Sequence, residues 1–223
     1  MSVTTDLDAH PFSKQLRAST WTVHQKANHS RYMSALFGGE LPLSGYARLA
    51  VQYYFIYQAI ERASDAMTGD AVGGEFVFDE LRRLPALERD LAHLVGPGWR
   101  HEIRPLPATA AYTARITEAS GWAGGYVAHH YTRYLGDIAG GQAIRRLLEK
   151  TFDLTGAGTL FYHFDLNGSA PAFRDNYRAK LDQAPWSEQE RSRVIGESRI
   201  AFEHNIAVFD ELAAELELGS ATE

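Results

Sequence analysis

The residues whose types and spacing could do chemistry lie together at positions 129–142, which read His-His-Tyr-Thr-Arg-Tyr-Leu-Gly-Asp-Ile-Ala-Gly-Gly-Gln. At about 100° per residue, Arg133, Gly136, Asp137 and Gly140 share one face of a helix. Two positions on that face lack a side chain, and a carboxylate and a guanidinium stand beside them. Such a face suits a planar ligand that lies on bare backbone, with hydrogen-bonded water held near its reactive atom.

Three glycines inside one helical pattern need an explanation. Gly136, Gly140 and Gly141 fall within a pattern that predicts a helix over residues 126–152. Each interior glycine destabilises a helix by about 0.5–1 kcal/mol relative to alanine. Close packing against another helix would account for small residues, and a glycine pair also predicts a kink. We favour a ligand on the backbone, because polar groups border the bare face.

Composition limits the classes of protein that fit. The chain has 223 residues, 45% of them hydrophobic, which is enough for one core. Its net charge of −6 and the lack of a basic stripe disfavour a nucleic-acid partner. The absence of cysteine excludes disulfides and thiolate metal ligands. With no secretory signal and no run of about 20 apolar residues, we expect a cytoplasmic monomer that is not bound to a membrane.

Apolar periodicity predicts helices almost throughout. The expected helices cover residues 11–28, 31–37, 45–67 with Ser44 as N-cap, 75–94 with a break near Pro85, 108–118, 126–152, 171–183 and 188–216. Ser187 and Glu190 form a capping box for the last of these. Residues 160–164 could be a short strand or a helical turn. These patterns predict an all-α fold of about eight helices in a single domain over residues 1–223, with an ordered core over about 11–216.

His24 lies on the first predicted helix, one turn beyond Thr20 and two turns beyond Arg17. A single histidine beside an apolar stripe is more often a packed residue than a ligand. His129 and His130 are adjacent and therefore do not share a helix face, so a buried structural role is expected for both.

The stretch Tyr-Thr-Arg-Tyr-Leu-Gly-Asp-Ile-Ala-Gly-Gly-Gln resembles the distal-helix signature of the haem oxygenases, usually G-D-[LI]-[SA]-G-G-Q, which residues 136–142 match without a gap. Leu-Arg-Ala-Ser-Thr-Trp-Thr-Val-His resembles that family's proximal helix, whose axial histidine corresponds to His24. The resemblance covers roughly residues 12–215. It implies that haem b, which is both substrate and cofactor, lies between the N-terminal helix and the glycine-kinked helix. The family often has glutamate four residues after this histidine, where this chain has Asn28. An amide carries no charge, so the potential of the iron would differ.

The resemblance also implies roles for particular residues. His24 would bind the iron. The other haem contacts would come from Arg17, Tyr131, Gly136, Gly140, Gly141, Arg174 and Arg178. The arginines at 174 and 178 would meet the propionates, although arginines four residues apart usually mark a solvated face. The catalytic residues would be Asp137, Arg133, Tyr54 and Gly136, with Asp137 delivering protons through water.

Tyr54 belongs to an aromatic stretch that is more often core. Phe202 and Asn205 resemble family positions near the pocket, but we expect them in the core. The implied reaction converts haem, with O2 and electrons from an external reductase or ferredoxin, to biliverdin, carbon monoxide and iron(II). The donor would dock near Arg17, Arg174 and Arg178.

One alternative is a haem-binding or haem-transfer protein without turnover. A related helical enzyme of thiamine degradation is a second alternative, but such enzymes usually depend on a cysteine that this chain lacks.

Overall fold

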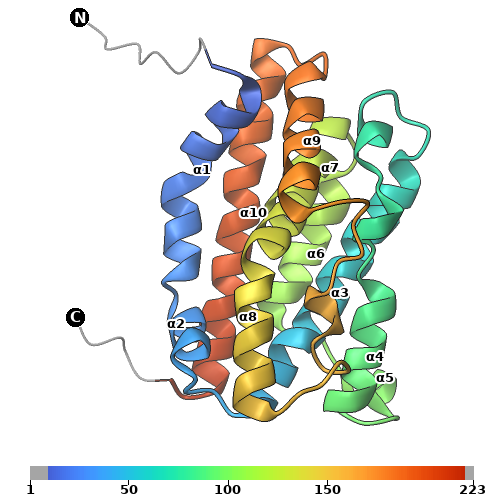
Figure 1. Ribbon diagram of the computed structural model, residues 1–223. Coiled ribbons are helices and arrows are strands. Elements are labelled where there is room, and N and C mark those ends of the chain that lie inside the picture. Colours follow the sequence, from blue (N-terminus) through green and yellow to red (C-terminus); the bar gives the residue numbers. More distant parts are fainter. Residues whose placement is uncertain (1–9, 219–223) are drawn as a thin grey trace, which may run out of the picture.

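All regular secondary structure in residues 10–218, the part of the chain that the computed structural model describes, is helical (Figure 1). The α-helices are α1 (Phe12–Asn28), α2 (Arg31–Gly38), α3 (Leu43–Met67), α4 (Leu84–Leu94), α5 (Trp99–Glu102), α6 (Pro107–Ala119), α7 (Ala123–His130), α8 (Gly136–Phe152), α9 (Ala170–Gln183) and α10 (Glu188–Glu215). Three 3-10 turns, η1 (Gly73–Phe76), η2 (Asp79–Leu81) and η4 (Leu160–Tyr162), and one π-helical turn, η3 (Tyr131–Leu135), complete the set. The predicted all-α fold is confirmed. Residues 1–9 and 219–223, at the two ends of the sequence, lie outside the described part.

The longest helix, α10, organises the packing. It contacts α1, α6, α7 and α2, and α3 packs in turn on α6 and α4. In Figure 1, α1 and α8 lie on either side of α10. The predicted capping box is present, because Ser187 Oγ accepts from the Glu190 N–H at 3.2 Å while the Glu190 carboxylate accepts from the Ser187 N–H at 2.9 Å. Two orphan N–H groups of this helix are thereby satisfied.

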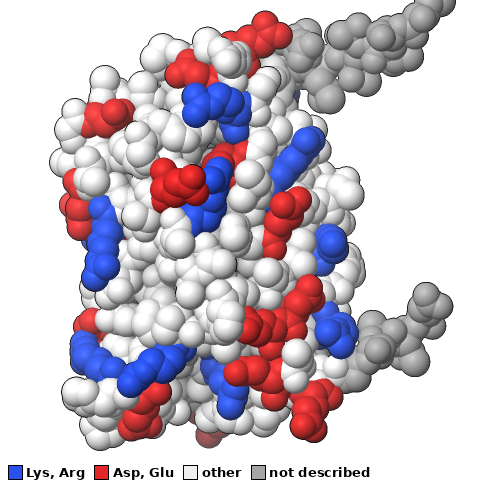
Figure 2. Space-filling model, turned by 180° about the vertical axis from the view of Figure 1, so that it is seen from behind, with Lys and Arg blue, Asp and Glu red and all other residues white. Residues whose placement is uncertain are grey.

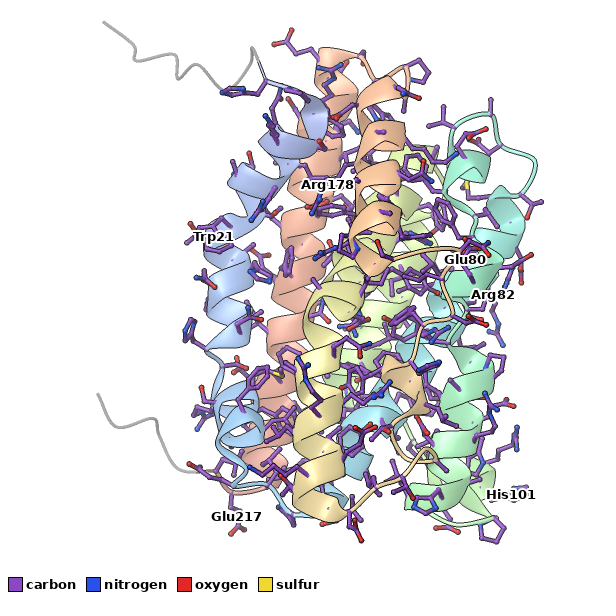
Figure 3. The ribbon with its side chains drawn as sticks, in the orientation of Figure 1. Trp21, Glu80, Arg82, His101, Arg178 and Glu217 are labelled. Carbon is purple, nitrogen blue, oxygen red and sulfur yellow. The ribbon has the colours of Figure 1, made fainter. Side chains whose placement is uncertain are left out.

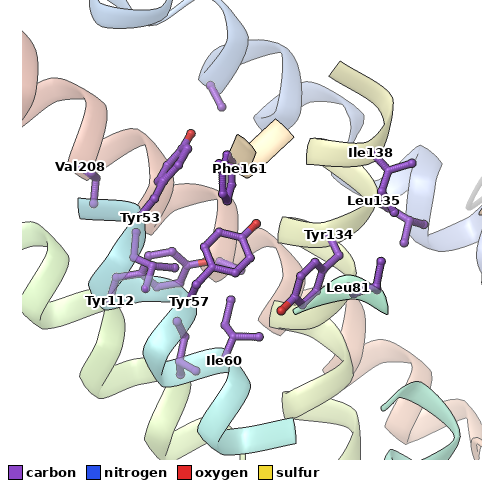
Figure 4. Close-up of a cluster of buried hydrophobic side chains, with 14 of the residues drawn as sticks. Tyr53, Tyr57, Ile60, Leu81, Tyr112, Tyr134, Leu135, Ile138, Phe161 and Val208 are labelled. Atoms are coloured by element: carbon purple, nitrogen blue, oxygen red, sulfur yellow. The ribbon is translucent and has the colours of Figure 1, made fainter. Parts of the chain in front are cut away.

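Aromatic side chains fill much of the core (Figure 4). The Tyr57 ring meets Tyr134 and Phe161 at centroid distances of 5.3 and 5.1 Å, both edge to face. These rings come from α3, η3 and η4, so the core joins the long helix α3 to both turns that flank α8. Edge-to-face pairs of buried rings add stability beyond the area they remove from water.

Two predicted helix starts are wrong. The third helix begins at Leu43 with Pro42 at its N-cap position, so Ser44 is not the cap. The fourth begins at Leu84 instead of residue 75, and η1 and η2 occupy residues 73–81. Pro85 causes the second difference, because proline lacks an N–H and is tolerated only in the first turn of a helix.

The long helix predicted over residues 126–152 is interrupted before the glycines. The π turn Tyr131–Leu135 separates α7 from α8, so the irregularity precedes Gly136 instead of lying at the pair Gly140-Gly141. Such π turns occur often at functional sites. Residues 160–164, which could have been a strand, contain the 3-10 turn η4.

Both adjacent histidines are buried, as expected. His129 Nε2 lies 3.0 Å from Glu197 Oε1, and His130 Nδ1 lies 2.9 Å from the Tyr177 hydroxyl. Within residues 10–218 no group of three His, Asp or Glu side chains could hold a metal ion by itself.

Candidate functional site

A cavity of about 710 Å³ lies between α1 and α8, and residues of α2, α9 and α10 complete its walls. This volume is typical of sites for small molecules and cofactors. Trp21 on α1 and Arg178 on α9, both of which line the cavity, are labelled in Figure 3. The cavity therefore separates the two helices that the sequence analysis singled out.

His24 stands on the α1 wall. Its ring is half-buried between Trp21 and Phe202, at centroid distances of 5.7 and 5.6 Å. Its Nε2 lies 3.4 Å from the amide nitrogen of Asn28, one turn further along α1, and its Nδ1 is buried without a hydrogen-bond partner. Burial lowers the pKa of His24, and the charge of Arg17 lowers it further. The ring is therefore kept neutral, which is the form that binds metals.

On the opposite wall, the glycines divide into two kinds. A Cβ at Gly136 or Gly140 would meet no atom within 4 Å outside the helix itself, so the backbone there faces open space. A Cβ at Gly141 would lie 2.8 Å from Cδ1 of Tyr162. Gly141 borders the cavity, but the space left by its missing side chain is filled by η4. The bare face consists of Gly136 and Gly140, and close packing explains Gly141.

Asp137 lies beside this bare face in a polar network. The Tyr57 hydroxyl donates to its Oδ2, and Nη2 of Arg133 lies 3.4 Å from both carboxylate oxygens. That distance is long for a charge-assisted hydrogen bond, which normally measures about 2.7–2.9 Å. Burial raises the pKa of Asp137 well above its usual range. The carboxyl group therefore holds a proton at pH values where an exposed aspartate is ionised.

Arg133 is itself fixed by neighbours from two other helices. Its Nη1 donates to Asn205 Oδ1 at 2.5 Å, and its guanidinium lies 4.4 Å from the ring centroid of Tyr53 and 5.4 Å from that of Tyr57. A cation over an aromatic face is stabilised by the ring quadrupole. Tyr53 on α3 and Asn205 on α10 therefore set the orientation of the guanidinium that faces Asp137.

The prediction of Tyr54 as a distal residue is wrong. Its ring packs edge to face on Trp99 at 4.9 Å, in a small second core cluster, and it does not line the cavity. Tyr53 and Tyr57 are one turn apart on α3 and share the face toward α8, whereas Tyr54 points about 100° away. The spacing of four residues, matching that of Arg133 and Asp137, was the signal that could have identified this pair.

Asn205 is buried, as expected of a core residue, and it also lines the cavity and bonds to Arg133. Phe202, the other residue expected in the core, is half-buried and contacts His24.

The remaining predicted contacts gather at the cavity. Arg17, Tyr131, Arg174 and Arg178 all line it. Arg174 Nε is buried without a partner, whereas Arg178 pairs with the exposed Asp175 at 2.8 Å. With Arg133, four arginines line the cavity, and Asp137 is the one carboxylate among its described lining residues. This balance suits a ligand that carries carboxylate groups.

The fold and the site define the class as an all-helical domain with a ligand cavity between its first helix and a glycine-bearing helix. A family model described as "Heme oxygenase" matches residues 10–211. The heme oxygenase of Rhodella violacea is 35% identical over 200 residues, covering 89% of this chain and 85% of that protein. Human heme oxygenase 1 is 35% identical over 204 residues, covering 90% and 71%.

Solved structures agree. Heme oxygenase-1 from Synechocystis sp. PCC6803 in complex with heme has a TM-score of 0.88 at 31% identity, covering 93% of this chain and 95% of that one. The heme oxygenase from Leptospira interrogans has a TM-score of 0.84 at 30% identity, covering 91% and 100%. The chain therefore belongs to the haem oxygenase family.

In the described part of the chain, no helix combines the length and the apolar character needed to cross a bilayer. The face opposite the view of Figure 1 carries acidic and basic side chains intermixed (Figure 2). That face has no extended basic surface of the kind that binds phosphate backbones.

Proposed function

We propose that this chain is a haem oxygenase that binds haem b as both substrate and cofactor and opens the macrocycle to biliverdin, carbon monoxide and iron(II). O2 and electrons from an external reductase or ferredoxin would complete the reaction. The observation that carries the proposal is the pairing of His24 on one wall of the cavity with the bare backbone of Gly136 and Gly140, beside Asp137, on the other. A planar molecule with a central metal fits between such walls.

The residues present fit haem. His24 offers a neutral imidazole whose Nδ1 has no competing partner, and the open space at Gly136 and Gly140 would be filled by any larger side chain. Arg17, Arg174 and Arg178 would hold the propionates, and Tyr131 would contact the macrocycle. When bound, haem supplies the iron that activates dioxygen and the ring carbon that is oxidised.

On the α8 side of the cavity, the protein itself contributes a proton donor that its neighbours hold in place. Because burial raises its pKa, Asp137 can donate a proton at its carboxyl group through an intervening water. Tyr57 and Arg133 fix the carboxyl, and Asn205 and Tyr53 fix Arg133. Delivery of the proton through water also means that no strong acid needs to be in direct contact with the dioxygen.

The electron donor would dock at the cavity rim, where Arg17, Arg174 and Arg178 concentrate positive charge on a chain whose net charge is −6. A donor with an acidic docking face would be steered there, and salt would weaken the encounter. The chain would act on haem as a monomer.

The test is to add haem, a reductase and NADPH and to follow the absorption spectrum. Loss of the Soret band together with a biliverdin absorption is expected. A haem carrier would bind haem and keep the Soret band under the same conditions, and that result would refute the proposal. The network around Asp137 favours turnover, because storage of haem does not need a proton donor.

A further inference from the structure

Among the described residues, no carboxylate is in contact with the His24 ring. Trp21 and Phe202 flank its ring, and the one side-chain hydrogen-bonding group within reach is the amide of Asn28 at 3.4 Å. Rotation of that amide about its last bond exchanges its nitrogen and oxygen, so Asn28 can accept the imidazole N–H through its carbonyl. In either orientation the partner of His24 carries no formal charge.

The charges around the cavity act in the same direction. The charge that acts on His24 is that of Arg17, which is positive. Arg174 and Arg178 line the cavity as well, and the carboxylate among the described lining residues, Asp137, stands on the opposite wall. Among the described lining residues, no carboxylate stands on the His24 side of the cavity.

The partner of a metal-bound imidazole controls how strongly that ring donates electrons. A carboxylate that accepts the N–H draws the proton away and makes the ring more basic, whereas an amide carbonyl does so only weakly. A more basic axial ligand stabilises iron(III) over iron(II) and lowers the reduction potential. Hydrogen bonding to the axial ligand is one of the few levers that a protein has on haem iron.

We propose that Asn28 is a positioning residue that keeps His24 a weakly basic ligand and thereby holds the bound iron at a higher reduction potential than a carboxylate at this position would. The inference rests on the proposed function only in requiring that haem iron binds at His24. Its consequence concerns the electron donor, because a substrate that is reduced more easily accepts electrons from a weaker reductant.

The experiment compares the haem complexes of the wild type, Asn28→Glu and Thr22→Glu by spectroelectrochemical titration, without turnover. Thr22 is exposed on α1 and does not line the cavity, so Thr22→Glu adds the same charge to the same helix without reaching the His24 ring. Asn28→Glu is expected to lower the ratio of iron(II) to iron(III) at a fixed potential about tenfold, which is about 59 mV for a one-electron couple. The iron–histidine stretching frequency of its ferrous complex should rise. Thr22→Glu should change neither quantity.

Two results would overturn the inference: an unchanged potential in Asn28→Glu, or equal shifts in Asn28→Glu and Thr22→Glu. Asn28→Asp, which keeps the length of the side chain, should also lower the reduction potential, with less disturbance of the end of α1. The haem complex of His24→Ala separates the two proposals. If it retains the iron–histidine vibration, the axial ligand of the proposed function is wrong.

Discussion

Gly140→Ala tests whether the glycines of α8 exist for a ligand, because the structure predicts opposite effects on stability and on binding. In the ligand-free protein an added Cβ meets no atom within 4 Å, so nothing opposes the helix propensity of alanine. The free energy of unfolding should therefore rise by about 0.5–1 kcal/mol. Urea denaturation of the ligand-free variant measures this gain.

Haem binding should change in the other direction. The methyl group would project into the space that the macrocycle must occupy, so we expect haem affinity to fall at least tenfold, which is about 1.4 kcal/mol. Titration of the variant with haem, followed at the Soret band, gives the affinity. If alanine stabilises the free protein and weakens the complex, the native glycine is there for the ligand.

Gly141→Ala is the matched control on the adjacent residue. Its Cβ would lie 2.8 Å from the ring of Tyr162, which is 1% exposed and has no room to move. Overpacking of this kind costs about 1–3 kcal/mol, so this variant should be less stable than the wild type. If Gly140→Ala binds haem as tightly as the wild type does, the bare backbone has no role in binding and the explanation of its open space is wrong.

Three further changes test the site and the core. Asp137→Ala is expected to keep its haem affinity but to form biliverdin more slowly by a factor on the order of 10², measured in single turnover, and a normal yield would remove Asp137 from proton delivery. His24→Ala should lose the imidazole-ligated spectrum of its haem complex and regain it with added imidazole, whereas an unchanged spectrum would assign the ligand to another histidine. Burial lowers the pKa of His130 from 6.5 to about 3, so between these values the unfolded chain binds more protons than the folded one. The free energy of unfolding should therefore fall as the pH drops from 6.5 toward 3, by up to about 1.4 kcal/mol per pH unit from this group. Urea titrations across this pH range give the free energy of unfolding at each pH. Its slope against pH should be flatter for His130→Phe than for the wild type, and equal slopes would contradict a lowered pKa of His130.

The helical character of the chain and the two walls of the site were predictable from the sequence. Apolar periodicity and the capping box at Ser187 are local signals, and they identified an all-α fold and the start of α10. The match at residues 136–142 and the stretch that ends at His24 identified both walls of the cavity. The local signals suffice for the helices because a helix and its faces are set by residues three and four positions apart. The two walls followed from the resemblance to a known family.

Other features depended on which elements come to lie side by side. The spacing of four residues pairs Tyr53 with Tyr57, but only the side of α3 that meets α8 decides that this pair, and not Tyr54, faces the site. Gly141 differs from Gly140 only because η4 places Tyr162 against it. Asn205 reaches Arg133 from 72 positions away in the chain. Contacts at such separations exist only once the helices have packed, so the tertiary structure alone decided which groups hold Asp137 in place.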